Sequence, residues 1–366
     1  MRLRIELDKD KISEIKDFSG EYIEILYSKG HAVLSSITGS ICVFGLMDVL
    51  DGDNEDFCIR VESKIFDKLS SEKFMDIAIL DSNIKILYYN SHDQFLYSII
   101  LERQQGFMEI KDKLELLKHL NDYDTVDLSN VSKFVTLLSK MELPLNVCNN
   151  VAYSYRSNSY FFKKFESPSF CCDSKILNKL ISINKKITLI ENYVYSELSN
   201  NGNSLFLNKL RMNETYDLDY ILKSKFTEVF EVDMSNLFSV LRRLPVKSEL
   251  GAFLNLNNST LSVETEDRTI ECNCSSTLVE SAEVVKEEDV DVSKLLENLK
   301  VGKSSSVDLN SKLINKYPIL NIPSWVLQSA ISKKYTKIYL NKNFLVIAVS
   351  GGKLVISRSD NIEQKG

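Results

Sequence analysis

Basic side chains recur along one face of a predicted helix at 174–186, and that spacing suits contact with phosphate groups. The polar face follows the order i, i+4, i+7 and i+11 and comprises Lys175, Lys179, Ser182 and Lys186. The opposite face is apolar and comprises Ile176, Leu177, Leu180 and Ile181. A second predicted helix, 130–141, places Lys133 and Lys140 outside in the same way. Spaced amines contact a phosphate backbone without reading bases, so we expect sequence-independent binding that depends steeply on salt.

The positive charge of the chain is concentrated on such segments. The 366 residues carry a net charge of −6, from 45 Lys and Arg against 51 Asp and Glu. The predicted helical segments carry +4 at 174–186, +3 at 234–247, +3 at 324–337, +2 at 130–141, +1 at 63–73 and zero at 9–18. They total +13, which leaves −19 on the remainder. For one helix, lysine is simply a soluble surface residue. Its recurrence favours nucleic-acid contact, and the lack of aromatic platforms disfavours single-strand stacking.

Other chemistry is not indicated. His31, His92 and His119 lie on different predicted elements, without a neighbouring nucleophile. The stretch 302–304, Gly-Lys-Ser, would end a phosphate loop only with glycine at 297, where Glu297 stands. The acids at 287–291 lack the spacing of a calcium loop. We therefore expect no catalytic residue, no metal and no cofactor, hence a binding protein and not an enzyme.

The cysteines and the hydropathy bear on the compartment. Seven cysteines is an odd number, and Cys171 and Cys172 are adjacent, which is typical of reduced thiols in a cytosolic protein. No run of 18 apolar residues is present, so no membrane association is expected.

A unit of one strand, one capped helix and two or three strands repeats along the chain. Its clearest copy has a strand at 57–61, a helix at 64–73 capped by Ser63, and strands at 75–80, 84–89 and 94–101. Further copies have their helices at 9–18, 130–141, 174–186, 234–244 and 325–334. Long strands are expected at 31–44 and 151–160. Six units average about 61 residues, and in pairs they give domains at 1–122, 123–224 and 225–366. An acidic insertion near 277–317 interrupts the last domain.

This organisation resembles the DNA sliding clamps, most of all the three-domain bacterial beta clamp, a DNA polymerase processivity factor. The best local stretches are 57–101, 219–256 and 319–358. The resemblance implies an α+β fold of three clamp-like domains, each a duplicated strand–helix–strand unit with helices inside and antiparallel sheets outside. It also implies a homodimer that closes a ring around double-stranded DNA. Polymerase and clamp loader would bind through short peptide motifs.

The resemblance assigns roles to residues where the units align. The DNA-facing residues would be Lys64, Lys68, Lys133, Lys140, Lys175, Lys179, Lys185, Lys186, Arg242, Arg243, Lys247, Lys333 and Lys334. The partner-peptide pocket between the second and third domains would comprise Phe161, Phe162, Tyr220, Leu222, Leu354 and Ile356. For these apolar residues, ordinary strand and linker packing is an equal alternative. The family ends within the last strand, whereas 359–366 here adds a polar tail.

Two readings of the function stay open. One is the sliding clamp, which would be cytoplasmic; a composition rich in Asn, Lys, Ile and Ser is compatible with a phage- or plasmid-encoded form. The other is a clamp-like interaction scaffold that recruits replication or transcription partners without encircling DNA.

Overall fold

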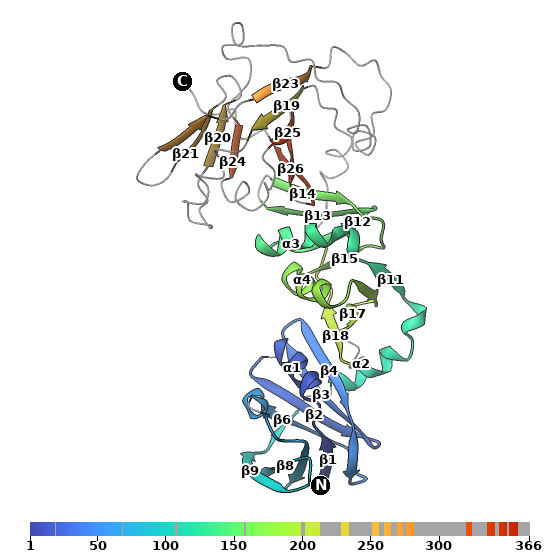
Figure 1. Ribbon diagram of the computed structural model, residues 1–366. Coiled ribbons are helices and arrows are strands. Elements are labelled where there is room, and N and C mark those ends of the chain that lie inside the picture. Colours follow the sequence, from blue (N-terminus) through green and yellow to red (C-terminus); the bar gives the residue numbers. More distant parts are fainter. Residues whose placement is uncertain are drawn as a thin grey trace. The chain divides into compact units, whose positions relative to one another are not determined.

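The computed structural model (Figure 1) describes the residues 1–18, 20–67, 69–106, 109–156, 159–198, 202–212, 228–233, 251–255, 260–264, 269–273, 276–281, 320–323, 335–340, 344–349 and 351–357. Contacts between Cα atoms divide the chain into two compact units. Unit 1 comprises Met1–Ser129 and Lys179–Leu210, and unit 2 comprises Asn130–Asn178 and Arg211–Gly366. The division into three domains at 122 and 224 stays a prediction. In the described part of the chain, no helix is long and apolar enough to cross a membrane.

Unit 1 contains two antiparallel sheets. The five-stranded sheet has the order β5 (Val49–Gly52), β1 (Arg2–Glu6), β7 (Phe74–Ile79), β8 (Asn83–Tyr89), β9 (Phe95–Glu102). The nine-stranded sheet has the order β10 (Gln104–Gln105), β6 (Phe57–Glu62), β2 (Tyr22–Ser28), β3 (His31–Thr38), β4 (Ile41–Met47), β18 (Ser204–Asn208), β17 (Tyr193–Glu197), β16 (Lys186–Leu189), β11 (Asp124–Asp127). Strands from both ends of the unit's sequence therefore share one sheet.

Unit 2 is also built on two antiparallel sheets. Its nine-stranded sheet has the order β15 (Phe170–Cys172), β12 (Leu145–Cys148), β13 (Val151–Arg156), β14 (Ser159–Lys164), β27 (Gly352–Ser357), β26 (Phe344–Val349), β25 (Tyr335–Leu340), β19 (Glu228–Asp233), β23 (Ser276–Ser281). The four-stranded sheet has the order β22 (Thr269–Asn273), β21 (Thr260–Glu264), β20 (Gly251–Asn255), β24 (Leu320–Pro323).

Short helices complete the described part. The α-helices are α1 (Lys9–Asp17), α2 (Glu109–Leu117), α3 (Ser132–Lys140) and α4 (Ser174–Ile183). The 3-10 helices are η1 (Ser63–Phe66), η2 (Leu120–Asp122) and η3 (Ser129–Val131). Asp8 caps α1 because its side chain accepts hydrogen bonds from the backbone of Asp10 and Lys11. Asp173 caps α4 in the same way, through the backbone of Lys175 and Ile176.

Six copies of the repeated unit can be traced in the strand order. Each begins with one strand, which is followed by a run of three whose third strands are β4, β9, β14, β18, β22 and β27. The strands β5, β10 and β23 come after the first, second and fifth of these runs. Two antiparallel pairs form among the third strands within the chain, β4 with β18 and β14 with β27. In the described residues, β9 and β22 remain at the edges of their sheets. The repeat therefore leaves two equivalent strands without their expected neighbour.

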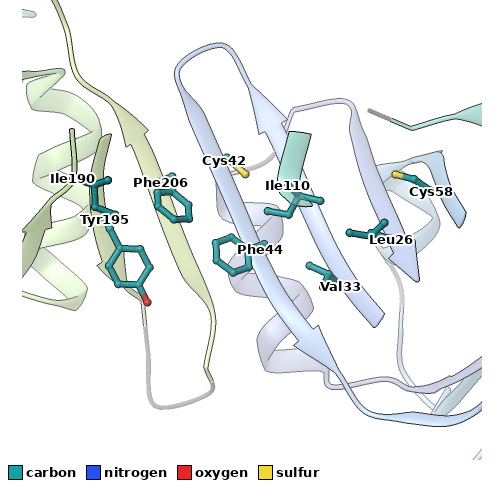
Figure 2. Close-up of a cluster of buried hydrophobic side chains, with 9 residues drawn as sticks. All are labelled: Leu26, Val33, Cys42, Phe44, Cys58, Ile110, Ile190, Tyr195 and Phe206. Atoms are coloured by element: carbon teal, nitrogen blue, oxygen red, sulfur yellow. The ribbon is translucent and has the colours of Figure 1, made fainter. Parts of the chain in front are cut away.

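The nine-stranded sheet of unit 1 is covered on both faces. Ile12 and Ile15 of α1 are buried on the face that carries Gly45. Ile110 of α2 belongs to a cluster on the opposite face, defined here as the seam cluster: Leu26, Val33, Cys42, Phe44, Cys58, Ile110, Ile190, Tyr195 and Phe206. Figure 2 shows the cluster extending across the pairing of β4 with β18. Phe206 is fully buried there, with its ring centroid 5.8 Å from that of Phe44.

The predicted helix at 64–73 is wrong in its length. Helix η1 ends at Phe66, and Ser63 lies inside it, after Glu62, which makes no side-chain cap hydrogen bond. The reason lies in Glu72, whose carboxylate accepts hydrogen bonds from the backbone N–H groups of Ser70 and Ser71. Those amides are engaged by a side chain and not by a helical carbonyl.

Other boundaries also differ from the prediction. Helix α4 ends at Ile183, because the Asn184 side chain accepts from the backbone of Lys186, which begins β16. The expected strand at 31–44 is a hairpin, with Gly39 at a positive φ of 55°. The expected strand at 151–160 is divided into β13 and β14, and α2 was not predicted.

Several predictions fall wholly or partly outside the described residues. The helices at 234–244 and 325–334 do so entirely. Of the acidic insertion at 277–317, residues 277–281 belong to strand β23, which pairs with β19. The start of the predicted insertion therefore belongs to the sheet, and 282–317 lie outside the described part, as does the tail 359–366.

Candidate nucleic-acid interface and partner surfaces

Helix α4 presents a basic face, as its sequence predicts. Leu177 and Leu180 are fully buried, whereas Lys175 and Lys179 are exposed on the opposite side. The Lys175 ammonium lies 2.9 Å from Glu142 Oε1, so its charge is partly offset. The Lys179 ammonium lies 5.5 Å from the ring centroid of Phe18, at the end of α1. A cation over an aromatic face keeps its charge available to a second ligand.

Helix α3 carries the second predicted pair of lysines. Phe134, Val135 and Leu138 are fully buried, and Lys133 and Lys140 are exposed. No salt bridge involves Lys133 or Lys140 among the described residues. Both lysines are therefore available to an external anion.

A side-chain hydrogen bond joins α3 to α4. The Thr136 hydroxyl donates to Asn178 Oδ1 across 2.8 Å. The bond holds the two helices side by side at their polar faces.

Lys163 of β14 also belongs to this surface, although the sequence did not predict it. Its ammonium donates to the Asn130 carbonyl oxygen at the start of α3. Burial and then the nearby charge of Lys133 lower the pKa of Lys163. No helical periodicity could have shown this, because Lys163 arrives from a strand.

Lys185 and Lys186 are exposed but lie beyond the helix, contrary to the predicted i+11 position of Lys186. Hydrogen bonds from Ser129, and then the charges of these two lysines, lower the pKa of Asp127. The nearby Asp127 carboxylate therefore offsets part of the positive charge of these two lysines.

The lysines of α1 and η1, in the first predicted domain, are engaged within the chain. Lys64 forms an ion pair with Glu62, and Lys16 forms one with Asp67. On α1, the Lys9 ammonium donates to the Ser70 carbonyl oxygen, and the Lys11 ammonium lies 3.1 Å from the carbonyl oxygen of Leu46. The predicted residues Lys68, Arg242, Arg243, Lys247, Lys333 and Lys334 lie outside the described residues.

The four described residues of the predicted pocket are brought together by the pairing of β14 with β27, but on two faces. Phe161 lies opposite Leu354, and both are fully buried. A Cβ on Gly352 would lie 2.8 Å from the Phe134 ring, so this face of β27, which includes Leu354 and Ile356, is turned towards α3.

Phe162 lies on the other face of the sheet. It belongs there to an apolar cluster, defined here as the outer cluster: Val151, Tyr153, Phe162, Tyr339, Val346 and Val355. Tyr220 and Leu222 lie outside the described residues. The described part of the predicted set therefore does not share one surface.

Among the described strands, β9 is an open edge with exposed apolar side chains. The exposed fractions are 56% for Phe95, 38% for Tyr97 and 65% for Ile100. In the sequence, this edge could be recognised because apolar residues occupy both faces of the strand, whereas a strand with one face in solvent needs them on the other face only. An exposed apolar edge of this kind favours pairing with another chain.

The residues considered for catalysis are scattered. His31, His92 and His119 are all exposed, on β3, in the turn before β9 and after α2. Among the described residues, no group of three or more His, Cys, Asp or Glu side chains could hold a metal ion. Burial raises the pKa of Cys58 to about 12 and that of Cys171 to about 11, so these thiols stay protonated.

Comparison with known proteins rests on the fold. No protein-family model matches this sequence, and no curated protein matches it in sequence. The DNA polymerase III subunit beta from Pseudomonas aeruginosa is similar with a TM-score of 0.60 and 11% identity, covering 98% of this chain and 99% of that chain. The DNA polymerase III subunit beta from Borrelia burgdorferi, solved with a natural product, is similar with a TM-score of 0.59 and 12% identity, covering 98% of this chain and 97% of that chain. The Helicobacter pylori beta clamp bound to a DNA ligase peptide is similar with a TM-score of 0.56 and 11% identity, covering 98% of this chain and 99% of that chain. The chain therefore has the α+β fold of the bacterial DNA polymerase III beta subunits, the sliding-clamp fold that its sequence predicts.

Proposed function

We propose that this protein is a DNA sliding clamp, a non-enzymatic processivity factor that encircles duplex DNA and tethers a replicative polymerase. The observation that carries the proposal is the pairing rule of the repeat. The third strands of four of these runs pair within the chain, as β4 with β18 and β14 with β27. The other two, β9 and β22, are edges among the described residues.

A second copy of the chain would supply the partner strands that β9 and β22 lack among the described residues. We expect β9 of one chain to pair antiparallel with β22 of the other, as β4 pairs with β18. Because β9 and β22 are different strands, the contact is head to tail, and two such contacts close a ring. Pairing would also cover the exposed side chains of Phe95 and Ile100.

The duplex contact would fall to exposed lysines on and after the helices. The described candidates are Lys133, Lys140, Lys175, Lys179, Lys185 and Lys186. Such contacts release counterions and do not read bases, so they permit sliding. Topological closure, and not contact affinity, would retain the protein on DNA. The remaining predicted DNA-facing residues stay a prediction.

Partner peptides would bind beside the outer cluster, where β14 pairs with β27. A structure of the Helicobacter pylori clamp holds a DNA ligase peptide, so a protein of this fold accepts a peptide ligand. On this chain, Phe161, Leu354 and Ile356 are turned towards α3, and Phe162 and Val355 are buried in the outer cluster. A ligand on that face would therefore contact the partly buried residues beside the cluster, Cys148, Tyr160 and Val229. We expect polymerase and clamp loader to use this face, in the cytoplasm where replication takes place.

Retention on circular DNA tests the function. The protein is diluted to separate its chains, mixed with nicked circular plasmid, concentrated and freed of loose protein by gel filtration in high salt. A ring stays on the circle and is lost after a restriction enzyme linearises it, unless a bulky protein blocks both ends. A scaffold that does not encircle DNA would bind circle and linear form equally, and that result would refute the proposal.

A further inference from the structure

A buried carboxylate, Glu72, lies beneath the open edge strand β9. Glu72 is only 5% exposed. Its Oε2 accepts hydrogen bonds from the backbone of Ser70, at 2.6 Å, and of Ser71, at 2.9 Å. Its Oε1 accepts a hydrogen bond of 3.0 Å from the hydroxyl of Tyr97, which belongs to β9. One side chain therefore connects the loop before β7 to the edge strand.

Tyr97 is fixed from two sides although it lies at the edge. Its ring stacks on the fully buried ring of Tyr88, with 4.8 Å between the centroids. Burial raises the pKa of Tyr97 to about 12, and the hydrogen bond to Glu72 adds to the shift. The hydroxyl therefore remains a donor at any physiological pH.

The Glu72 carboxylate remains charged in this position. Burial raises its pKa, but the donated hydrogen bonds outweigh that effect, and the pKa lies below the ordinary 4.5. The neighbouring face of the sheet is apolar, with Ile84, Ile86 and Tyr88 fully buried. A charged group at such a place is tolerated only because its oxygens have donors. The arrangement of Ser70, Ser71 and Tyr97 is therefore tied to the carboxylate.

We propose that Glu72 is a positioning residue for ring closure. It holds Tyr97 and the loop at 69–73 in one arrangement, so β9 meets a second copy as a preformed edge. An edge ordered in advance loses less conformational entropy when it associates, and its affinity is higher for that reason. The inference rests on the proposed pairing of β9 with β22.

The test compares the dissociation constant of the dimer with the stability of the separated chain in four variants. E72A removes every acceptor. E72Q can accept from Ser70 and Ser71 through its oxygen and donate to the Tyr97 hydroxyl through its amide. Y97F removes only the hydroxyl. Y89F is the control, because Tyr89 is a tyrosine of the adjacent strand β8 with its hydroxyl on Asp76.

Sedimentation equilibrium gives the dissociation constant of the dimer. Urea unfolding at a protein concentration below that constant gives the stability of the separated chain. We expect E72A to weaken dimerisation about tenfold at each of two identical contacts, hence about a hundredfold overall. Y97F should follow in the same direction, E72Q should recover most of the affinity, and Y89F should match the wild type.

The outcomes separate the two proposals. A wild-type protein that sediments as a single chain overturns the ring closure and this inference with it. A dimeric wild type whose affinity is unchanged in Y97F, or weakened equally in Y89F, overturns the role of Glu72 alone. If E72A does not fold, Y97F set against E72Q and Y89F decides the question.

Discussion

Neutralising the lysines of α3 and α4 should flatten the salt dependence of DNA binding. The change is K133Q, K140Q and K179Q together, at three exposed positions whose ammonium groups form no salt bridge among the described residues. A ring of two chains would present six such groups. Each phosphate contact contributes a slope of about 0.9 in log affinity against log salt, so six would contribute about 5. Because a duplex cannot touch the whole circumference at once, we expect a loss of about 2 to 3.

The matched control is K9Q, K11Q and K16Q on α1. Those three amines already lie against the Ser70 carbonyl, the Leu46 carbonyl and the Asp67 carboxylate. Their removal should change the slope by less than about 1. Fluorescence anisotropy with a labelled duplex, titrated at several salt concentrations, gives both slopes. Equal slopes for the two triple variants would refute the assignment of phosphate contacts to α3 and α4.

Three further predictions concern unit 1 and the buried thiols. G45A should lower the free energy of unfolding by about 2 to 4 kcal/mol in urea titrations, because its Cβ would lie 2.0 Å from the Asn203 side-chain oxygen; a loss below about 0.5 kcal/mol would contradict this packing. Cys58 and Cys171 should resist a thiol reagent in the folded protein near about pH 8 and react in denaturant, since burial raises the pKa of both thiols; rapid labelling of the folded protein would count against it. Because the pKa of folded Glu72 lies below 4.5, its stabilising effect should be complete above pH 4.5 and lost as the pH falls through the folded value; E72Q should remove that part of the acid dependence, and an unchanged pH profile would show that Glu72 has no such effect.

The repeat was predictable because each unit carries its own local signals. The apolar stripe of α4 and the Asp173 cap fix one helix without knowledge of the rest. Hairpins such as β26 with β27 follow from alternation and from a glycine, Gly351, at a positive φ of 79°. Short-range physics therefore suffices for most strands and for the order in which they come.

Helix η1 shows where local signals fail. Ile65, Phe66 and Leu69 have helical spacing, yet the backbone of Ser70 and Ser71 is engaged by a carboxylate. The competing hydrogen bonds depend on the burial of Glu72 beneath β9, a strand about 25 residues away. No window of helical length contains both partners.

The face on which a pocket residue lies also depends on long-range pairing. Phe161 and Phe162 are neighbours in sequence, so one of them must face α3 and the other the outer cluster. The choice is set by the register of β14 with β27, two strands separated by nearly 200 residues. The sequence could predict that the two strands contribute to one region but not which side chains share a surface.

The mass of the protein in solution tests the central claim most directly, namely that the open edges β9 and β22 of one chain meet those of a second copy. One chain has a mass of 41.9 kDa. Sedimentation equilibrium at micromolar concentration should give twice that mass, and a charge placed on the edge by I100K should return it to a single chain while the fold is retained. A wild-type mass of one chain across the whole concentration range would contradict the closure of the ring.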